Sequence, residues 1–404
     1  MRRSTWHINA HIPVFFYLFS LVLALPWIKT SEDPKWLLIH LLLLGAITNL
    51  IFIWSTHFSL TMLRLPNFPE NRGYVFRVLI LNIGIWLVII GKSQEAPLLI
   101  FTGAAALCQS AILHALAIRR YISKALLARF RKVMRYYISA SLFLTAGAVI
   151  GANLSQHHSA EIKSRLLVAH YLVNILGWVG LTVAGTLITF IPTMLRTKLP
   201  EFAEKRGQQS LPWLVLALTL SASGALLGNR FVVALGVVGY LAAWSYLLSP
   251  HSNYLDPLRK LPFSIKSVTA SSIWLFVALL DLSWTLLSQD SWIEIKSRTE
   301  SISLILAIGF AMQIVLGALS YLVPMILGGG PNAVRLNNEK MVFLSNERFL
   351  ALNLGLLLVA TNKSGWIFNI GGFLLLFTLV ITILLFLSMT ISYILSQKKH
   401  QISR

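Results

Sequence analysis

The chain has 404 residues, of which 56% are hydrophobic and only 12% are charged, and its mean hydropathy is +0.72. Charged residues make up about a quarter of a soluble domain, so this composition excludes a soluble globular protein and predicts an integral membrane protein. The formal net charge of +20 would ordinarily suggest a nucleic-acid partner, so its meaning depends on where the charges lie. The single cysteine, Cys108, excludes an internal disulfide and a paired-cysteine metal motif.

Apolar segments follow one another along the whole chain. A helix needs about 20 apolar residues to cross the hydrocarbon core of a bilayer. On that basis we expect an all-α polytopic bundle that forms a single transmembrane domain over residues 1–404, with no soluble domain and with a retained first helix rather than a cleaved signal peptide. The twelve predicted spans are 11–29, 36–63, 74–91, 96–118, 136–154, 165–195, 211–227, 231–248, 267–288, 301–326, 344–361 and 366–396.

The basic residues alternate between the two sides of this predicted bundle. With the N-terminus inside, 25 of the 34 Lys and Arg fall on inner segments and nine on outer ones, with the densest run between Arg119 and Arg135. This bias predicts that both termini are cytoplasmic and that the protein lies in the cell membrane as a multi-pass protein. The positive charge therefore indicates topology and attraction to the anionic inner leaflet, and gives no evidence for nucleic acid.

Four histidines lie at membrane depth on the predicted spans. His40 on span 2 and His170 on span 6 each follow the outer start of their helix by about five residues, so we expect them at the same depth. His57 on span 2 and His114 on span 4 lie near the inner ends of their helices, at a second matching depth. Coordinating groups at membrane depth are costly and indicate function by default.

Height-matched histidine pairs on separate helices are an arrangement that can hold a heme or a metal ion, since neutral imidazole binds iron and copper. The alternative is that each ring bonds a neighbouring carbonyl or lies in the headgroup region. Four other residues are candidates for the surroundings of such a site: Asn174, Asp281, Gln313 and Met312. Gly180 and Ala184 on span 6 have small-xxx-small spacing, which favours close helix packing or the approach of a flat macrocycle.

Three segments carry a family resemblance: residues 40–58, from His40 through His57, residues 169–197, from Ala169 through Arg196, and residues 317–331, which end in Gly-Gly-Gly-Pro. Together they resemble the membrane part of actinobacterial copper-oxidase-like proteins. Those proteins are in turn similar to heme-copper oxidase subunit I and to the NnrS family of heme- and copper-containing membrane proteins. The resemblance implies that His40 matches the helix 2 histidine that holds a low-spin heme, and that His170 matches the helix 6 histidine that binds copper.

The chain also departs from that family pattern. Span 7 lacks the paired histidines of the oxidase copper site, and span 10 has Met312 and Gln313 where the oxidases have heme-ligating histidines. We therefore do not expect oxygen reduction by the oxidase mechanism. A cupredoxin-type copper domain often follows the membrane part in the resembling proteins, so we expect a separate cupredoxin or another electron donor as the partner here.

These observations favour a membrane protein that binds heme b, copper or both and handles electrons or a diatomic gas, nitric oxide or oxygen, near the outer face. Whether it is an enzyme stays open. Two alternatives remain. The first is a secondary transporter, although we see no repeat between the two halves of the chain that such proteins commonly show. The second is a non-catalytic scaffold or assembly subunit of a copper or respiratory complex.

Overall fold

The computed structural model describes residues 3–24, 33–65, 71–125, 128–254, 261–328, 330–362 and 364–402. These residues form helices joined by short connections, with no strand among them. The helices are α1 (Arg3–Ala10), α2 (Ile12–Ala24), α3 (Pro34–Ile39), η2 (His40–Ile47), α4 (Thr48–Met62), α5 (Asn71–Ser93), α6 (Pro97–Lys124), η3 (Arg129–Lys132), α7 (Arg135–Asn153), α8 (Ala160–Tyr171), η4 (Leu172–Gly180), α9 (Leu181–Leu195), α10 (Ala203–Leu227), α11 (Arg230–Leu248), η5 (Ser249–Tyr254), α12 (Phe263–Ser288), α13 (Trp292–Leu304), η6 (Ile305–Met312), α14 (Gln313–Leu327), α15 (Pro331–Val342), α16 (Ser345–Thr361) and α17 (Gly365–Ile402).

Within the described residues, eleven helices are long and apolar enough to cross a membrane, and the number is twelve if α15 and α16, which meet at a 44° bend, count as one span. The predicted all-α polytopic bundle is therefore confirmed. The first predicted span, 11–29, lies on a helix described over residues 3–24, and residues 25–29 lie outside the described residues. The cytoplasmic placement of the termini remains a prediction.

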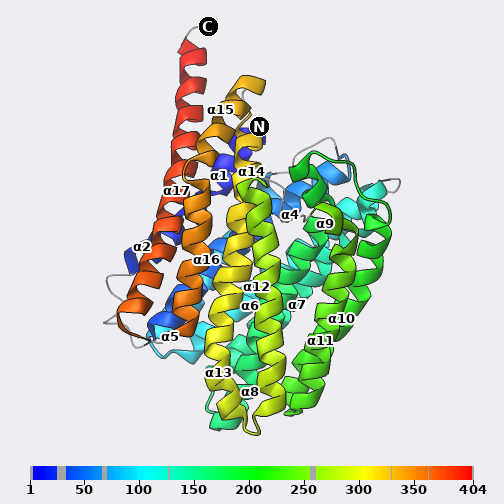
Figure 1. Ribbon diagram of the computed structural model, residues 1–404, viewed down its shortest axis with the longest axis vertical. Coiled ribbons are helices and arrows are strands. Elements are labelled where there is room, and N and C mark those ends of the chain that lie inside the picture. The colour runs from blue at the N-terminus through cyan, green and yellow to red at the C-terminus, as the bar shows by residue number, and fades with distance from the viewer. Residues whose placement is uncertain are drawn as a thin grey trace. The chain divides into compact units, whose positions relative to one another are not determined.

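The chain divides into two compact units. The larger comprises residues 11–254 and 276–303, and the smaller comprises residues 1–10, 255–275 and 304–404. In the larger unit α10 and α11 run side by side as an antiparallel pair, and in the smaller unit α16 and α17 do the same (Figure 1). That residues 1–404 form one transmembrane domain stays a prediction.

Three spans contain a π-helical segment, and these spans recur at an interval of four along the chain. The segments η2, η4 and η6 lie in the second, sixth and tenth spans. Each is followed by an α-helix of 15 residues, which is α4, α9 or α14. Pro192 and Pro324 each lie three residues before the end of α9 and α14. Because π-helical turns are rare and concentrate at functional sites, this repeated geometry directs attention to the second, sixth and tenth spans.

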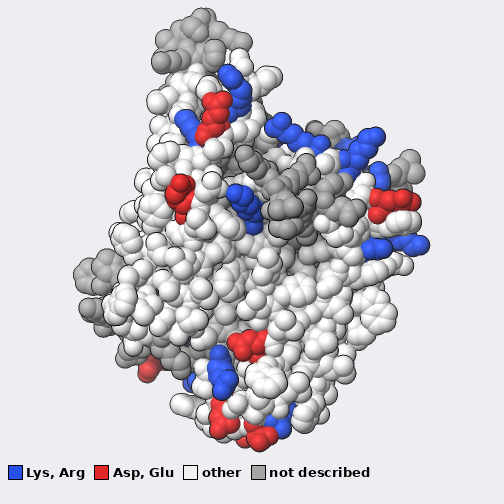
Figure 2. Space-filling view, viewed as in Figure 1, with Lys and Arg blue, Asp and Glu red and all other residues white. Residues whose placement is uncertain are grey.

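The same three spans are the most buried. Their most apolar stretches are 61%, 89% and 72% buried, whereas the value is 50% or less in the other eight helices that pass the same length and hydropathy criteria. Many side chains on those other helices are large, apolar and exposed, as expected of surfaces that face lipid. Charged side chains gather mostly toward the helix ends on the face drawn in Figure 2. These features together describe a multi-pass membrane protein.

Candidate functional site

The segment before His40 fixes the position of its ring. The Asp33 side chain caps the helix by accepting a hydrogen bond from the backbone N–H of Trp36 at 3.2 Å, and Pro34 occupies the first turn. The Nδ1 atom of His40 then lies 2.7 Å from the carbonyl oxygen of Trp36. The indole of Trp36 stacks on the His40 ring, with centroids 4.1 Å apart and an interplanar angle of 25°. The imidazole is therefore held on two sides by one helical turn.

His170 is held by a neighbouring helix rather than by its own. Its Nδ1 atom lies 3.0 Å from the carbonyl oxygen of Gly147 on α7. A Cβ atom at Gly151, one turn further along α7, would lie 2.7 Å from Cε1 of His170. Only glycine at position 151 leaves room for the imidazole as it stands, because van der Waals contacts between carbon atoms are optimal at about 3.5–4.0 Å.

Both hydrogen bonds determine which ring nitrogen carries the proton. A backbone carbonyl can only accept, so Nδ1 donates in His40 and in His170, and Nε2 keeps its lone pair. No Nε2 hydrogen bond of either ring is found within the described part of the chain. Histidines that bind metals usually donate their other N–H to a carbonyl or a carboxylate in this way. The carbonyl contacts expected of a purely structural histidine are thus present, but they occupy only one nitrogen of each ring.

The two rings come together although they lie 130 residues apart in sequence. Their centroids are 6.3 Å apart and their planes differ by 21°. Both side chains are half-buried. Metal–nitrogen bonds of about 2.0–2.1 Å on either side of one ion would place two imidazole centroids about 6–6.5 Å apart. The separation therefore suits a single metal centre between His40 and His170.

The amide of Asn174 lies beside His170. Its Nδ2 atom is 2.8 Å from the backbone carbonyl of His170 and 3.3 Å from Nδ1. The same amide lies directly against Gly147, where a Cβ atom would come within 2.3 Å of Oδ1. Asn174 therefore packs next to the histidine and restricts its ring, in the place that helix periodicity predicts for it.

The other predicted surrounding residues lie elsewhere. Asp281 is exposed on α12 in the larger unit and has no hydrogen bond or ion pair to another described residue. Gln313 and Met312 are buried and belong to the smaller unit. There Gln313 donates to Asn353 at 3.2 Å, and Trp274 donates to the same amide oxygen at 2.7 Å. Gln313 is thus part of a polar network of its own unit.

The predicted inner pair does not meet in the same way. Nε2 of His114 donates to Ser55 Oγ at 2.8 Å, because that hydroxyl donates its own hydrogen to the carbonyl of Ile51 at 2.5 Å. His57 lies two positions beyond Ser55 on α4, about 200° around the helix, and its ring contacts Trp54 and Phe58. His57 therefore lies away from the face of α4 that Ser55 presents to His114 on α6.

The small-residue face of the sixth span is filled by aromatic side chains. A Cβ atom at Gly177, Gly180 or Gly185 would come within 2.6 Å of Phe143, Tyr240 or Tyr136, respectively. The Tyr240 hydroxyl also donates to the carbonyl of Leu176 at 2.9 Å, within η4. Of the two interpretations of this face, the structure shows helix packing.

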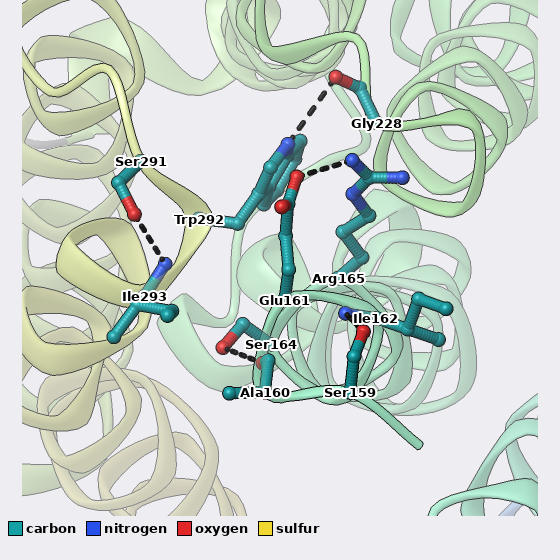
Figure 3. Close-up of polar contacts among 10 residues, drawn as sticks. All are labelled: Ser159, Ala160, Glu161, Ile162, Ser164, Arg165, Gly228, Ser291, Trp292 and Ile293. Atoms are coloured by element: carbon teal, nitrogen blue, oxygen red, sulfur yellow. Dashed lines mark hydrogen bonds and ion pairs between the residues drawn. The ribbon is translucent and has the colours of Figure 1, made fainter.

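A polar cluster anchors the start of the sixth span, where α8 begins at Ala160, about 15 Å along the axis from His170 by helical rise. Ser159 caps α8 by accepting from Ile162 N at 3.4 Å, and Glu161 pairs with Arg165 on the same helix. Trp292, the first residue of α13, donates from Nε1 to the carbonyl of Gly228 at 3.2 Å (Figure 3). The cluster thus fixes the N-terminal end of α8, the helix that carries His170.

Within the described residues, no group of three or more His, Cys, Asp or Glu side chains could hold a metal ion. The pair of His40 and His170 thus offers two nitrogen donors. No protein-family model matches the chain, and a search among curated proteins gives no match.

Sequence reasoning missed three residues of the site: Trp36, Gly147 and Gly151. Each carries a signal in the sequence. Trp36 lies four positions before His40, which places an aromatic ring on the same helix face. Gly147 and Gly151 have the small-xxx-small spacing that marks close approach between helices.

Proposed function

We propose that this chain is a multi-pass membrane protein that binds a redox cofactor, heme b or copper, between His40 and His170. The observation that carries the proposal is the pair itself: two half-buried imidazoles from different helices, 6.3 Å apart between centroids, each with Nδ1 bonded to a carbonyl and Nε2 left for a ligand. A structural histidine has no need of a second histidine at this distance.

The donor set favours heme over a copper ion alone. His40 and His170 would be the two side chains that hold a heme, whose porphyrin would supply the other ligands of the iron, whereas a protein copper site more often has a third or fourth side-chain ligand. A heme held by these two histidines would supply one-electron transfer or the binding of a diatomic gas such as nitric oxide. The role of the chain is to hold both rings and to fix their tautomers.

The family resemblance supports the same assignment. The segments that resemble actinobacterial copper-oxidase-like proteins, heme-copper oxidase subunit I and the NnrS family include both histidines. Because the tenth span carries Gln313 and Met312 in place of histidine, the proposal is electron transfer or gas handling and excludes the oxidase mechanism. We propose the cell membrane as the location and a separate cupredoxin or similar donor as the electron source, with anionic lipid at the inner face.

The repeated π-helical spans bear on the transporter alternative. They recur every four helices, at the second, sixth and tenth spans. Two related halves of six helices would instead give a repeat at every sixth span. We therefore keep the transporter and scaffold hypotheses as the alternatives that would be favoured if the purified protein bound no cofactor.

The test is the cofactor content of the purified full-length protein, expressed in a host supplied with both heme and copper. We expect a dithionite-reduced minus oxidised spectrum with heme bands, or one copper ion per chain by metal analysis. His40→Ala and His170→Ala should each reduce the bound cofactor several-fold. His157→Ala, at an exposed loop histidine, is the matched control and should leave the content unchanged.

Two results would reject the proposal. One is wild-type protein that contains neither heme nor copper under these conditions, which would favour the transporter or scaffold hypotheses. The other is a wild-type spectrum in both histidine variants, which would place any cofactor elsewhere.

A further inference from the structure

A cation is buried near the predicted inner end of the third span, away from the histidine pair. Arg77 on α5 is only 8% exposed. Its Nε and Nη2 atoms are buried and have no hydrogen-bond partner among the described residues, and no salt bridge joins it to a described carboxylate. Burying an unpaired charge costs several kcal/mol, so this guanidinium needs a partner that the described side chains do not supply.

The contacts around Arg77 place its guanidinium in a polar environment. Ser110 on α6 donates to the backbone carbonyl of Arg77 at 2.8 Å, so these two residues lie level with each other. Long side chains on a helix point back toward its N-terminus, and the Arg77 carbon Cζ accordingly lies 5.9 Å from the ring centroid of Tyr74. His114, one turn beyond Ser110 on the antiparallel α6, lies at the level to which the guanidinium points.

Helix α4 contributes further polar groups to the same level. Ser55 bonds His114, and Ser59 follows it by one turn on the same face of α4. The hydroxyls of Ser59 and Thr56 are fully buried, and neither has a hydrogen-bond partner among the described residues. Nδ1 of His114 is buried and unbonded in the same way. His114 Nδ1 is thus an unsatisfied polar atom at the level of the unpaired cation, and Thr56 and Ser59 add unsatisfied hydroxyls elsewhere on α4, although buried polar groups are nearly always bonded.

Gly73 leaves an opening on one side of this cluster. It is exposed, and a Cβ atom built on it would lie 3.9 Å from Nη1 of Arg77. A long side chain at position 73 would therefore cover the guanidinium from that side. The exposed Arg72 and Arg64 lie at the adjoining predicted inner ends of α5 and α4, so an anion that reaches position 73 meets a positive field.

We propose that Arg77 binds a phosphate group at the predicted inner end of α4, α5 and α6. A guanidinium has the donor geometry for two phosphate oxygens. Basic pockets between membrane helices on the inner side bind the headgroups of anionic lipids. The phosphate belongs to an anionic phospholipid or is free inorganic phosphate, and this proposal stands independently of the histidine pair.

Binding is measured by native mass spectrometry of the full chain released from detergent, with phosphatidylglycerol, phosphatidylcholine or inorganic phosphate as the probe. We expect Arg77→Gln to lower the affinity for the bound phosphate probe about 10-fold or more, because a hydrogen bond to a charged group contributes about 1.5–3 kcal/mol. Gly73→Leu should lower it as well, with Arg77 still present. Lys205→Gln, at an exposed basic residue of α10 away from this cluster, is the control and should change affinity less than about 5-fold by the surface-charge estimate of about 0–1 kcal/mol.

Comparison of the three probes distinguishes a lipid phosphate from free inorganic phosphate. Binding of phosphatidylglycerol over phosphatidylcholine, lost in Arg77→Gln and Gly73→Leu, supports a lipid headgroup. Binding of inorganic phosphate with the same dependence on Arg77 supports a free anion. The proposal is wrong if neither probe binds the wild-type protein, or if both variants bind as the wild type does. Should Arg77→Gln fail to fold, Gly73→Leu alone decides the matter, since it leaves the buried arginine in place.

Discussion

Gly151→Ala is the sharpest test of how His170 is held. The added methyl would lie 2.7 Å from Cε1 and 3.1 Å from Nδ1 of the imidazole. Carbon atoms in contact prefer about 3.5–4.0 Å, so the ring must move by about 1 Å. Overpacking of this kind costs about 1–3 kcal/mol. The same movement breaks the 3.0 Å hydrogen bond to Gly147, which adds about 0.5–1.5 kcal/mol. The preference of a helix interior for alanine over glycine offsets up to about 1 kcal/mol of this, so the free energy of unfolding should fall by about 0.5–4.5 kcal/mol.

The assay is reversible unfolding in mixed micelles, followed by circular dichroism, with cofactor content measured on the same sample. Gly239→Ala is the matched control in the same unit, because its nearest neighbour would be the Ala217 Cβ at an ordinary 3.5 Å. Alanine is favoured over glycine inside a helix by up to about 1 kcal/mol, so this variant should be as stable as the wild type or slightly more so. Equal stability of the two variants, with unchanged cofactor content, would refute the placement of His170 against α7.

Two further predictions concern stability. Tyr240→Phe should lower the free energy of unfolding by about 0.5–1.5 kcal/mol in the same assay, because it removes the hydrogen bond from the tyrosine hydroxyl to the Leu176 carbonyl in η4, which keeps the backbone N–H of Leu181 as its other donor; a change below 0.3 kcal/mol would contradict this bond. Asp281→Leu should raise stability in lipid bilayers by about 1–3 kcal/mol, because an exposed carboxylate seven residues before the end of α12 lies within the apolar layer. Glu95→Gln, at an exposed residue between α5 and α6 with no ion pair to a described residue, serves as its control, and a destabilised Asp281→Leu would show that the carboxylate has a partner.

Sequence reasoning reached the fold because the fold is dictated by composition. Apolar segments long enough to cross a bilayer can satisfy their backbone groups only as helices, and twelve such segments could be counted directly. The sequence also predicted a common depth for His40 and His170 from their distances to the helix starts, but α3 begins six residues before His40 and α8 begins ten residues before His170. These are one-dimensional properties, set by the order of residues along the chain.

Rotation about each helix axis and the contacts between helices were decided by the tertiary structure alone. His57 and His114 share a predicted depth, just as His40 and His170 do. The rings of His40 and His170 lie 6.3 Å apart between centroids. His114 instead contacts Ser55 of α4, and His57 lies on another face of that helix. The distinction arises because a residue two positions from another lies about 200° away around the helix.

The sequence by itself determined that this protein spans a membrane through many helices and that its few coordinating side chains lie at particular depths, because hydrophobicity and helical rise act locally. The tertiary structure decided which side chains meet. The glycines of α7 make room for His170, and the π-helical turns of η2, η4 and η6 change the register of three spans without a local sequence signal. Arg77 shows the same limit, since its burial beside α6 depends on packing between helices, which no single segment specifies.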